Sequence, residues 1–261
     1  MLMEQRHKLI LEELTRTGSV KNADLVKRMG VSSETIRKDL ELLESQGLLS
    51  RVHGGALAGQ AGEHAERSQA DYVPFDMRLL QNLDVKMQLV AKAAEFVHEG
   101  QRIALDAGTS SWALAHILKE KFHRLTVVTN SIKIVLELMD CPGFTVICTG
   151  GVLMSDEYSF VSDFAFNVLE KCNLNLTFLT ASGVTVETGL TDQRMEDIRV
   201  QDKMRRAAQK TIAVVDSSKF LQPSLLSICS LRDIDILITD DNLAPDLAAN
   251  IRREVGELIL V

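Results

Sequence analysis

The chain has 261 residues, of which 46% are hydrophobic and 25% charged, and its formal net charge is −7 at pH 7. This composition excludes a globally disordered chain and leaves room for one large domain, or for one small and one medium domain. No apolar run reaches the roughly 18–20 residues that a membrane-spanning helix needs, and the first ten residues lack the apolar stretch of a signal peptide. We therefore expect a cytoplasmic protein without a membrane partner.

The four cysteines show neither the spacing of a zinc site nor that of a disulfide framework. Small thiols in a protein core, in a reducing compartment, are the better interpretation. The sequence accordingly predicts no metal site and no cofactor.

The acidic charge is distributed unevenly along the chain. Read alone, a net charge of −7 argues against nucleic acid as a partner, because the phosphate backbone attracts basic surfaces. Residues 1–58, however, contain nine Lys and Arg against eight Asp and Glu, so the acidic excess lies in the rest of the chain. The net charge therefore does not exclude DNA as a partner of the first segment.

Three helices and a hairpin are predicted in this first segment. Apolar side chains at helical spacing predict a helix over 3–16 and a short helix over 22–29 that stops at Gly30. A third helix is expected from Ser32, which is a favourable N-cap, to Gly47. Two short apolar stretches then flank a pair of glycines, which permit the positive φ angles of a hairpin turn.

This order of elements is typical of a winged helix-turn-helix, whose third helix enters the major groove of DNA. Arg37 and Lys38 lie opposite the apolar face of that helix, where they reach guanine edges or phosphates. The hairpin would form a wing along the DNA backbone, with Arg51 and His53 at its tip. The same residues also allow a three-helix bundle with solvated charged faces, because helix-turn-helix signals are short and degenerate.

A polar segment without apolar periodicity, residues 59–74, predicts a linker between one domain over 1–58 and a second over 75–261. The second domain begins with an amphipathic helix over 84–98, after which apolar runs alternate with helical stretches. This alternation predicts an α/β fold with a mostly parallel sheet. The expected strands lie at residues 102–106, 125–130, 144–150, 176–183, 211–216, 234–240 and 258–261.

Small hydroxyl residues, glycines and acids follow most of these strands. Ligands of an open parallel sheet bind beyond the carboxyl ends of its strands, and a rim of this composition suits a phosphate or sugar hydroxyls. Residues 108–111 directly precede a helical stretch whose free N–H groups and dipole favour an anion, and Lys219 would add a counter-charge. For any single motif, the simpler alternative is an ordinary turn or helix cap.

Residues 6–56 resemble the N-terminal domain of the DeoR/GlpR family of bacterial transcription regulators. The resemblance rests on the Val31-Ser32 turn, the stretch 34–40 (ETIRKDL), Leu43-Glu44, Gly47 and the stretch 51–56 (RVHGGA). It implies DNA contacts for four residues of the third helix, namely Ser33, Thr35, Arg37 and Lys38. Glu34 and Glu41 are expected to stabilise that helix instead.

The resemblance continues through the second domain. The motifs that match the family's effector domain are DAGTS (106–110), VVTNS (127–131), TGG (149–151), ASG (181–183), TGL (188–190), VVDSSKF (214–220) and LITD (237–240). That domain is similar in fold to ribose-5-phosphate isomerase, and the resemblance implies a phosphorylated sugar or related metabolite as effector. The implied effector-binding residues are Asp106, Gly108, Thr109, Ser110 and Lys219, with Asn130, Gly150, Gly151 and Ser182 nearby.

Three positions depart from the family pattern. Ser162 stands where the family usually has Gly, and Asn175 replaces the Asp that commonly begins the next strand motif. Gln201 falls near a position often occupied by Lys. These departures bear on the choice of effector and leave the DNA-binding motif untouched.

Catalysis by the second domain is the main alternative. Sugar isomerisation needs a positioned carboxylate base, and the stretch 179–183 (LTASG), which corresponds to the paired aspartates of the isomerases, contains none. We therefore expect a DNA-binding regulator that is not an enzyme: a homo-oligomeric repressor of a sugar-catabolic operon, which binds double-stranded operator DNA and a phosphorylated sugar. The alternatives are an isomerase-like enzyme whose first domain serves assembly, and a protein-interaction module.

Overall fold

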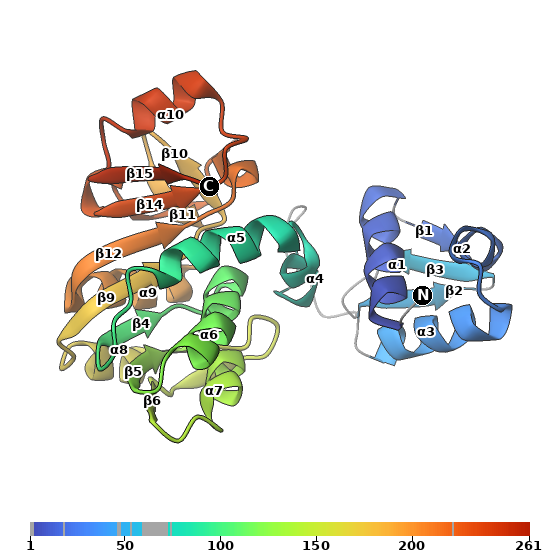
Figure 1. The fold of residues 1–261 in the computed structure, drawn as a ribbon, viewed down its shortest axis with the longest axis horizontal. Helices are drawn as coiled ribbons and strands as arrows, with labels where there is room; N and C mark the ends of the chain where they lie inside the picture. Colours follow the sequence, from blue (N-terminus) through green and yellow to red (C-terminus); the bar gives the residue numbers. More distant parts are fainter. Residues whose placement is uncertain are drawn as a thin grey trace. The chain divides into compact units, whose positions relative to one another are not determined.

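The computed structural model describes residues 3–17, 19–45, 48–52, 54–58, 73, 75–220 and 222–261. His53, one of the predicted DNA contacts, lies outside these ranges. The chain divides into two compact units, Met1–Gln81 and Asn82–Val261, and most of their elements are labelled in Figure 1. In the described ranges no helix is both long and apolar enough to cross a membrane.

The first unit contains the three predicted helices and the predicted hairpin. The helices are α1 (Met3–Thr17), α2 (Asn22–Met29) and α3 (Ser33–Ser45), and a further helix, α4 (Phe75–Leu80), ends the unit. The hairpin strands are β2 (Leu49–Val52) and β3 (Gly55–Ala58). The sequence did not predict β1 (Ser19–Lys21), which pairs with β3 and leaves β2 at an edge of the small sheet.

One apolar core holds the three helices together. It contains Ile10 and Leu14 of α1, Leu25 and Met29 of α2, and Ile36, Leu40 and Leu43 of α3. Gly30 ends α2 in the left-handed region, at φ 64° and ψ 31°, where its N–H donates to the carbonyl oxygen of Val26 at 3.0 Å. A side chain is strained in that conformation, so the turn between α2 and α3 depends on glycine.

The second unit is built on a seven-stranded parallel sheet in the order β15-β14-β12-β9-β4-β5-β6. Its strands are β4 (Arg102–Leu105), β5 (Leu125–Thr129), β6 (Phe144–Cys148), β9 (Leu174–Leu179), β12 (Ala208–Val214), β14 (Ile236–Thr239) and β15 (Glu257–Leu260). Each coincides with a predicted strand to within a few residues. The predicted α/β class with a mostly parallel sheet is confirmed.

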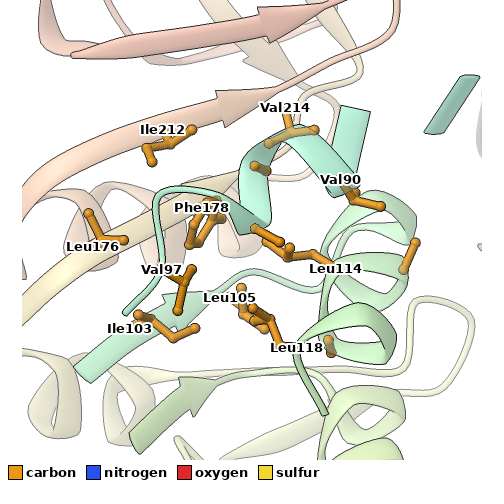
Figure 2. Packing of buried hydrophobic residues seen from close by; sticks show 14 of the residues in the cluster. Val90, Val97, Ile103, Leu105, Leu114, Leu118, Leu176, Phe178, Ile212 and Val214 are labelled. Carbon is orange, nitrogen blue, oxygen red and sulfur yellow. The ribbon is translucent and has the colours of Figure 1, made fainter. Parts of the chain in front are cut away.

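Helices cover both faces of this sheet, so its strands are apolar on both sides. Helices α5 (Leu83–Ala94), α6 (Thr109–Lys121) and α7 (Ile132–Leu138) pack on the face that carries Ile103, Leu105 and Phe178 (Figure 2). Helices α8 (Asp163–Leu169) and α9 (Met195–Ala207) pack on the opposite face, against Ala104 and Val128. Alternate residues of β4 thus enter different cores, as the two-residue period of a strand requires.

Two small antiparallel sheets were not predicted. The first pairs β7 (Val152–Met154) with β8 (Ser159–Val161), and the second has the order β10-β11-β13. The strands of the second are β10 (Gly183–Thr185), β11 (Gly189–Asp192) and β13 (Leu226–Cys229). Together with α10 (Pro245–Ile251) and the short helices η1 (Ser217–Phe220) and η2 (Leu231–Asp233), they complete the unit.

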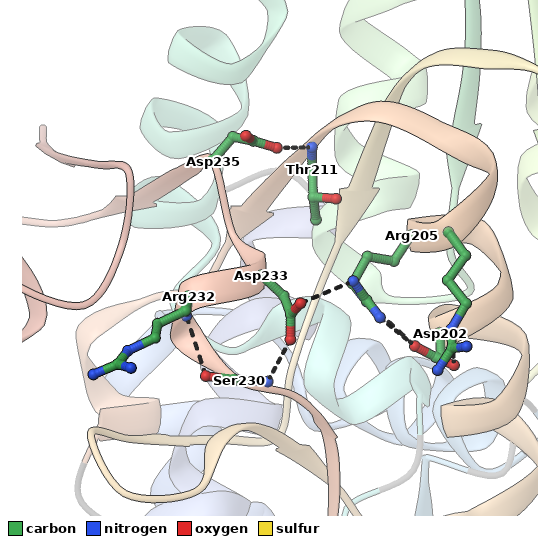
Figure 3. Close-up of polar contacts among 8 residues, drawn as sticks. Asp202, Arg205, Thr211, Ser230, Arg232, Asp233 and Asp235 are labelled. Carbon is green, nitrogen blue, oxygen red and sulfur yellow. Dashed lines mark hydrogen bonds and ion pairs between the residues drawn. The ribbon is translucent and has the colours of Figure 1, made fainter.

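Polar contacts fix α9 to the segment that precedes β14 (Figure 3). The Arg205 guanidinium donates to the carboxylate of Asp202 at 2.9 Å and to that of Asp233 at 3.1 Å. Asp233 also closes a capping box with Ser230 at the start of η2. Asp235 accepts a hydrogen bond from the backbone N–H of Thr211 at 2.7 Å, which ties the entrance of β14 to β12. Helix α9, which carries Gln201, is therefore held in a fixed position on the sheet.

Candidate functional sites

The start of α3 is fixed by the predicted N-cap. The Ser32 Oγ accepts a hydrogen bond from the backbone N–H of Thr35 at 3.1 Å and lies 2.8 Å from the Thr35 hydroxyl. This pattern satisfies one of the N–H groups that the first turn of a helix leaves free. Thr35, a predicted DNA contact, is half-buried and already shares a hydrogen bond with Ser32.

The two faces of α3 differ as the helix-turn-helix interpretation requires. Ser33, Arg37 and Lys38 are exposed, while Ile36 and Leu40 are fully buried in the core of the first unit. The Arg37 side chain keeps 67% of its surface exposed, and its Nε lies 3.7 Å from the nearest Glu41 oxygen. An exposed i,i+4 ion pair of this kind is weak, so Arg37 is available to a ligand.

Asp39 is the buried acid of α3 and joins that helix to α1. Its carboxylate accepts two hydrogen bonds from the Arg6 guanidinium, at 2.6 and 2.9 Å, and lies 3.2 Å from the Nε2 of His7. Only 4% of the Asp39 side chain and 11% of the Arg6 side chain is exposed. A bidentate pair of this geometry sets the orientation of α3 relative to α1.

Arg51, predicted as a DNA contact of the wing, has acidic partners on α3. Its guanidinium donates to Glu41 at 2.7 Å and to Glu44 at 2.8 Å, and its backbone N–H donates to Glu44 at 2.8 Å. The backbone hydrogen bond from Arg51 is the main reason that the pKa of Glu44 lies below its ordinary value. Hydrogen bonds to Glu41 and Glu44 raise the pKa of Arg51 in turn. The structure thus ties β2 to α3 through Arg51.

In the second unit, four predicted effector-binding residues, Asp106, Gly108, Thr109 and Ser110, lie where the strand order reverses. From β4 the chain continues outward through β5 to β6, and from β9 it continues in the other direction through β12, β14 and β15. The carboxyl ends of β4 and β9 therefore flank the switch point of the sheet, which is where open α/β sheets bind ligands. Asp106 follows β4 at this point, and Thr180 follows β9.

Asp106 is 1% exposed, and its carboxylate is surrounded by donors from the protein. Oδ1 accepts from the N–H of Gly108 at 3.1 Å and from the Ser111 hydroxyl at 2.5 Å. Oδ2 accepts from the N–H of Thr180 at 2.7 Å and from the Gln201 amide at 2.8 Å. The immediate role of Asp106 is thus to hold the β4–α6 loop against the end of β9.

The β4–α6 loop also touches β9 through Gly108, the N-cap of α6. A Cβ atom built on Gly108 would lie 1.9 Å from the Thr180 hydroxyl oxygen, a distance that only glycine avoids. Thr109 and Ser110 are buried in the first turn of α6. Free N–H groups and the positive end of the helix dipole make this turn suitable for an anion.

Lys219 lies in η1, beyond the carboxyl end of β12, which is the strand next to β9. It is half-buried, and within the described ranges its ammonium group makes no hydrogen bond or ion pair. The turn before it is held by Asp216, which is 5% exposed and accepts from the Asn82 amide at 3.1 Å. The same Asn82 amide lies 3.4 Å from the Ser218 hydroxyl.

The remaining predicted effector residues are spread along the same edge of the sheet. Asn130 follows β5 and is 1% exposed, and its side-chain amide donates to the Phe160 carbonyl at 3.4 Å. Gly150 and Gly151 follow β6 with φ angles of 66° and 118°. Ser182 lies beyond β9, where its hydroxyl donates to Asp192 at 3.0 Å. The order of the strands places Asn130 nearer to Asp106 than the two glycines.

A cluster of acids lies at the start of α9. Asp197 accepts a hydrogen bond from the Ser159 hydroxyl at 3.0 Å. Burial raises the pKa of Asp197 to about 7; the Ser159 hydrogen bond opposes this shift, while the neighbouring Glu157 and Asp192 add to it. The charge of Arg194 lowers the pKa of Asp197, and Arg194 also forms an ion pair with Asp156. Within the ranges that the structure describes, no group of three or more His, Cys, Asp or Glu side chains could hold a metal ion.

Comparison with known proteins gives two family matches. Residues 6–60 match the DeoR-like helix-turn-helix domain, and residues 81–241 match the DeoR C terminal sensor domain. The chain belongs to the DeoR family. The predicted family and the predicted DNA-binding regulator are confirmed, and the plain three-helix bundle and the interaction module are not supported.

Relatives match this DeoR-family chain over nearly its whole length. The uncharacterized HTH-type transcriptional regulator YulB of Bacillus subtilis (strain 168) is 36% identical over 94% of this chain and 92% of its own. The glycerol-3-phosphate regulon repressor of Escherichia coli (strain K12) is 29% identical over 92% of both chains. The L-fucose operon activator of Haemophilus influenzae is 28% identical over 94% of this chain and 95% of its own. These relatives are named as regulators and not as enzymes, in agreement with the prediction that the chain is not an enzyme.

Among solved structures, ribose 5-phosphate isomerase A of Methanocaldococcus jannaschii aligns with 54% of this chain and 56% of its own, with 16% identity and a TM-score of 0.41. The isomerase-like part of the predicted fold therefore stays a prediction.

The positions at which this DeoR-family chain departs from its family pattern have structural roles. Ser162 adopts φ 156°, in a region that favours glycine, and its hydroxyl accepts from the N–H of Phe164 at the start of α8. Asn175 accepts from the N–H of Arg102 at 2.9 Å. The Gln201 amide donates to Asp106 and to the carbonyl of Thr180, and its Oε1 is buried with no hydrogen-bond partner among the described residues.

Sequence reasoning did not select Thr180, Glu41 or Glu44 as part of either site. Thr180 was seen at a strand end, but its contact with Asp106 becomes recognisable only when β9 is known to lie beside β4, because strand order is not written in the sequence. Glu44 was seen as a family position, and Glu41 was taken as a helix-stabilising residue. The proximity of both to Arg51 depends on how the wing folds back on α3.

Proposed function

We propose that this chain represses a sugar-catabolic operon by binding operator DNA through α3 and the β2–β3 wing. The observation that carries the proposal is the division of α3 into a buried apolar face and an exposed face with Ser33, Arg37 and Lys38. An exposed basic helix face on a packed three-helix core suits the major groove, where Arg and Lys donate to guanine and phosphate. Thr35 is included as a contact on the family resemblance, and His53 on its predicted place at the tip of the wing.

The effector in this proposal is a phosphorylated sugar bound at the switch point of the parallel sheet. The first turn of α6, beside Gly108, offers N–H groups and a positive dipole, and Lys219 offers an ammonium group that has no partner among the described residues. Both features favour a phosphate. One relative, the glycerol-3-phosphate regulon repressor, is named for a phosphate ester.

The mechanism is thermodynamic linkage between the two sites. An effector that binds more tightly to one state of the sensor unit shifts the protein toward that state, and the operator affinity changes by the same coupling factor. Operators read by helix-turn-helix proteins are commonly two-fold symmetric, so the proposal includes a dimer or tetramer of this chain.

DNA binding is tested with a duplex from the region upstream of the chain's own gene, at moderate salt. Arg37→Ala should weaken binding about 10- to 100-fold, since a specific base contact contributes about 1–3 kcal/mol. Lys121→Ala, which removes one exposed positive charge from α6, is the matched control and should bind as the wild type does. Wild-type protein that prefers this duplex no more than a scrambled one would refute the proposal.

Effector binding is tested by adding a panel of phosphorylated sugars and glycerol 3-phosphate to the protein–DNA complex. At least one of them should shift the wild-type affinity for DNA, and inorganic phosphate at the same concentration should shift it less. Lys219→Ala should keep DNA binding and lose most of the response, because the ammonium group next to the phosphate is removed. An unchanged response in Lys219→Ala would exclude Lys219 from the effector site.

A further inference from the structure

Arg51 of β2 binds α3 through both its side chain and its backbone. Its guanidinium contacts two carboxylates one turn apart on α3, at 2.7 Å for Glu41 and 2.8 Å for Glu44. The side chain of Arg51 is only 34% exposed, compared with 67% for Arg37. A guanidinium shared by two carboxylates is already largely neutralised, so it offers much less positive charge to a phosphate than Arg37 does.

The backbone of β2 depends on the same contact. β2 is an edge strand, because the sheet order is β1-β3-β2 and β3 is its sole neighbour in the described residues. The Arg51 N–H donates at 2.8 Å to the Glu44 carboxylate on α3, outside the strand ladder. Glu44 therefore accepts a hydrogen bond from the Arg51 N–H at the free edge of β2, and it also binds the Arg51 side chain. One carboxylate thus binds both the backbone and the side chain of Arg51.

Simple electrostatics predicts that Glu41 and Glu44 weaken DNA binding. A carboxylate near a DNA-binding surface repels phosphates, so removing it should tighten binding if charge alone mattered. Glu41 and Glu44 are 47% and 40% exposed on the same helix as the proposed DNA contacts. The sign of the effect of their removal on DNA affinity therefore separates a charge effect from a positioning effect.

We propose that Glu44, supported by Glu41, is a positioning residue for DNA binding, which acts through Arg51 to hold the wing in register with α3. Arg51 is then chiefly a connector between the two DNA-contacting elements and only secondarily a phosphate contact. The inference rests on the proposed use of α3 and the wing for DNA binding. It goes beyond that proposal because it assigns Glu41 and Glu44 a favourable contribution to DNA affinity.

The central test is a double-mutant cycle in the full-length chain, measured as affinity for the upstream duplex. Glu44→Ala should weaken binding about tenfold, a size typical of coupled neighbours. In the Arg51→Ala background the same change should have almost no further effect, because Glu44 acts through Arg51. Glu34→Gln is the matched control: it removes an exposed acid from the first turn of α3 that has no bond to Arg51, and it should leave affinity unchanged or slightly raise it.

A readout without DNA separates this inference from the proposed function. Hydrogen exchange at the Arg51 amide should be faster in Glu44→Ala than in the wild type, and unchanged in Glu34→Gln. Glu44→Gln, which keeps an acceptor for the Arg51 N–H, should restore most of this protection. Equal or tighter DNA binding by Glu44→Ala, or a tenfold loss that persists without Arg51, would overturn the inference. Failure of the wild type to bind DNA would instead refute the proposed function, while the exchange measurement would still test how the wing is held.

Discussion

Asp39 shows how one buried acid can hold α3 in place. Its carboxylate meets the Arg6 guanidinium in a bidentate pair and lies beside His7, both of which belong to α1. Asp39 belongs to the stretch 34–40 that resembles the family, but no role for it was predicted from the sequence, because Arg6 and His7 are far from it along the chain. The pairing exists only when α1 and α3 pack together.

We expect Asp39→Ala to destabilise the first unit by about 2–4 kcal/mol, since removal of one partner leaves a largely buried guanidinium without an acceptor. Asp39→Asn keeps an acceptor and should cost about half as much. Hydrogen exchange of the α1 and α3 amides in the full chain measures the loss. Similar protection in Asp39→Ala and in the wild type would show that the pair contributes nothing to the stability of the unit.

Asp197 makes the stability of the second unit depend on pH. Burial raises its pKa in the folded state to about 7 from the ordinary value of 3.8. Between these two values the folded state binds more protons than the unfolded state, so stability falls as pH rises from about 4 to 7. Above pH 7 the full cost is present, on the order of 2–4 kcal/mol.

Asp197→Asn should therefore stabilise the second unit at pH 8 and have little effect at pH 4. Urea unfolding at the two pH values, followed by the fluorescence of Trp112, gives the comparison. The Asn side chain keeps an acceptor for the Ser159 hydroxyl, so the variant changes the charge more than the contact. A difference between variant and wild type that is the same at both pH values would contradict the raised pKa.

At the scale of elements, helices and buried strands were predictable and the small sheets were not. The helix over 22–29 and its stop at Gly30 match α2 and its left-handed cap, because amphipathic spacing and glycine chemistry are local. The predicted helix over 84–98 ends earlier, at Ala94, where Glu95, Phe96 and Val97 donate to carbonyls three residues back in a tighter turn. Strands such as β7 and β10, of three residues each, are too short to leave a periodic pattern.

The loop between β4 and α6 offers a test of packing between elements. Gly108 has φ −74°, which any residue adopts, so an alanine there meets only the steric obstacle of Thr180. We expect Gly108→Ala to separate the loop from β9, to lower the stability of the second unit by about 1–3 kcal/mol, and to abolish the effector response. Thermal unfolding and the phosphorylated-sugar panel measure the two effects. A wild-type melting temperature together with a wild-type effector response would show that the close contact between Gly108 and Thr180 is not needed for stability or for effector binding.

At the scale of the whole molecule, Asn82 connects the start of the second unit to the proposed effector site. It is the first residue of that unit, has φ 52°, and binds Asp216 and Ser218 in the turn that carries Lys219. A ligand that moves this turn therefore acts on the point where the chain enters the sensor unit.

Asn82→Gly should uncouple the two sites. Glycine adopts the same φ without strain but cannot donate to Asp216, so DNA binding and effector binding should persist while the effector's influence on DNA affinity falls several-fold. The measurement is the ratio of DNA affinities with and without an active sugar phosphate. A ratio equal to that of the wild type would exclude the Asn82 contact from the coupling.

The sequence by itself determined the family, the three helices and hairpin of the first unit and the strands of the parallel sheet, because periodicity, caps and motifs are properties of neighbouring residues. The tertiary structure decided which of these residues meet. It placed Thr180 and Gln201 against Asp106, since strand order puts β9 beside β4. It also paired Arg51 with Glu41 and Glu44, since the wing folds back on α3. Contacts between distant segments depend on packing and burial, and no local pattern encodes them.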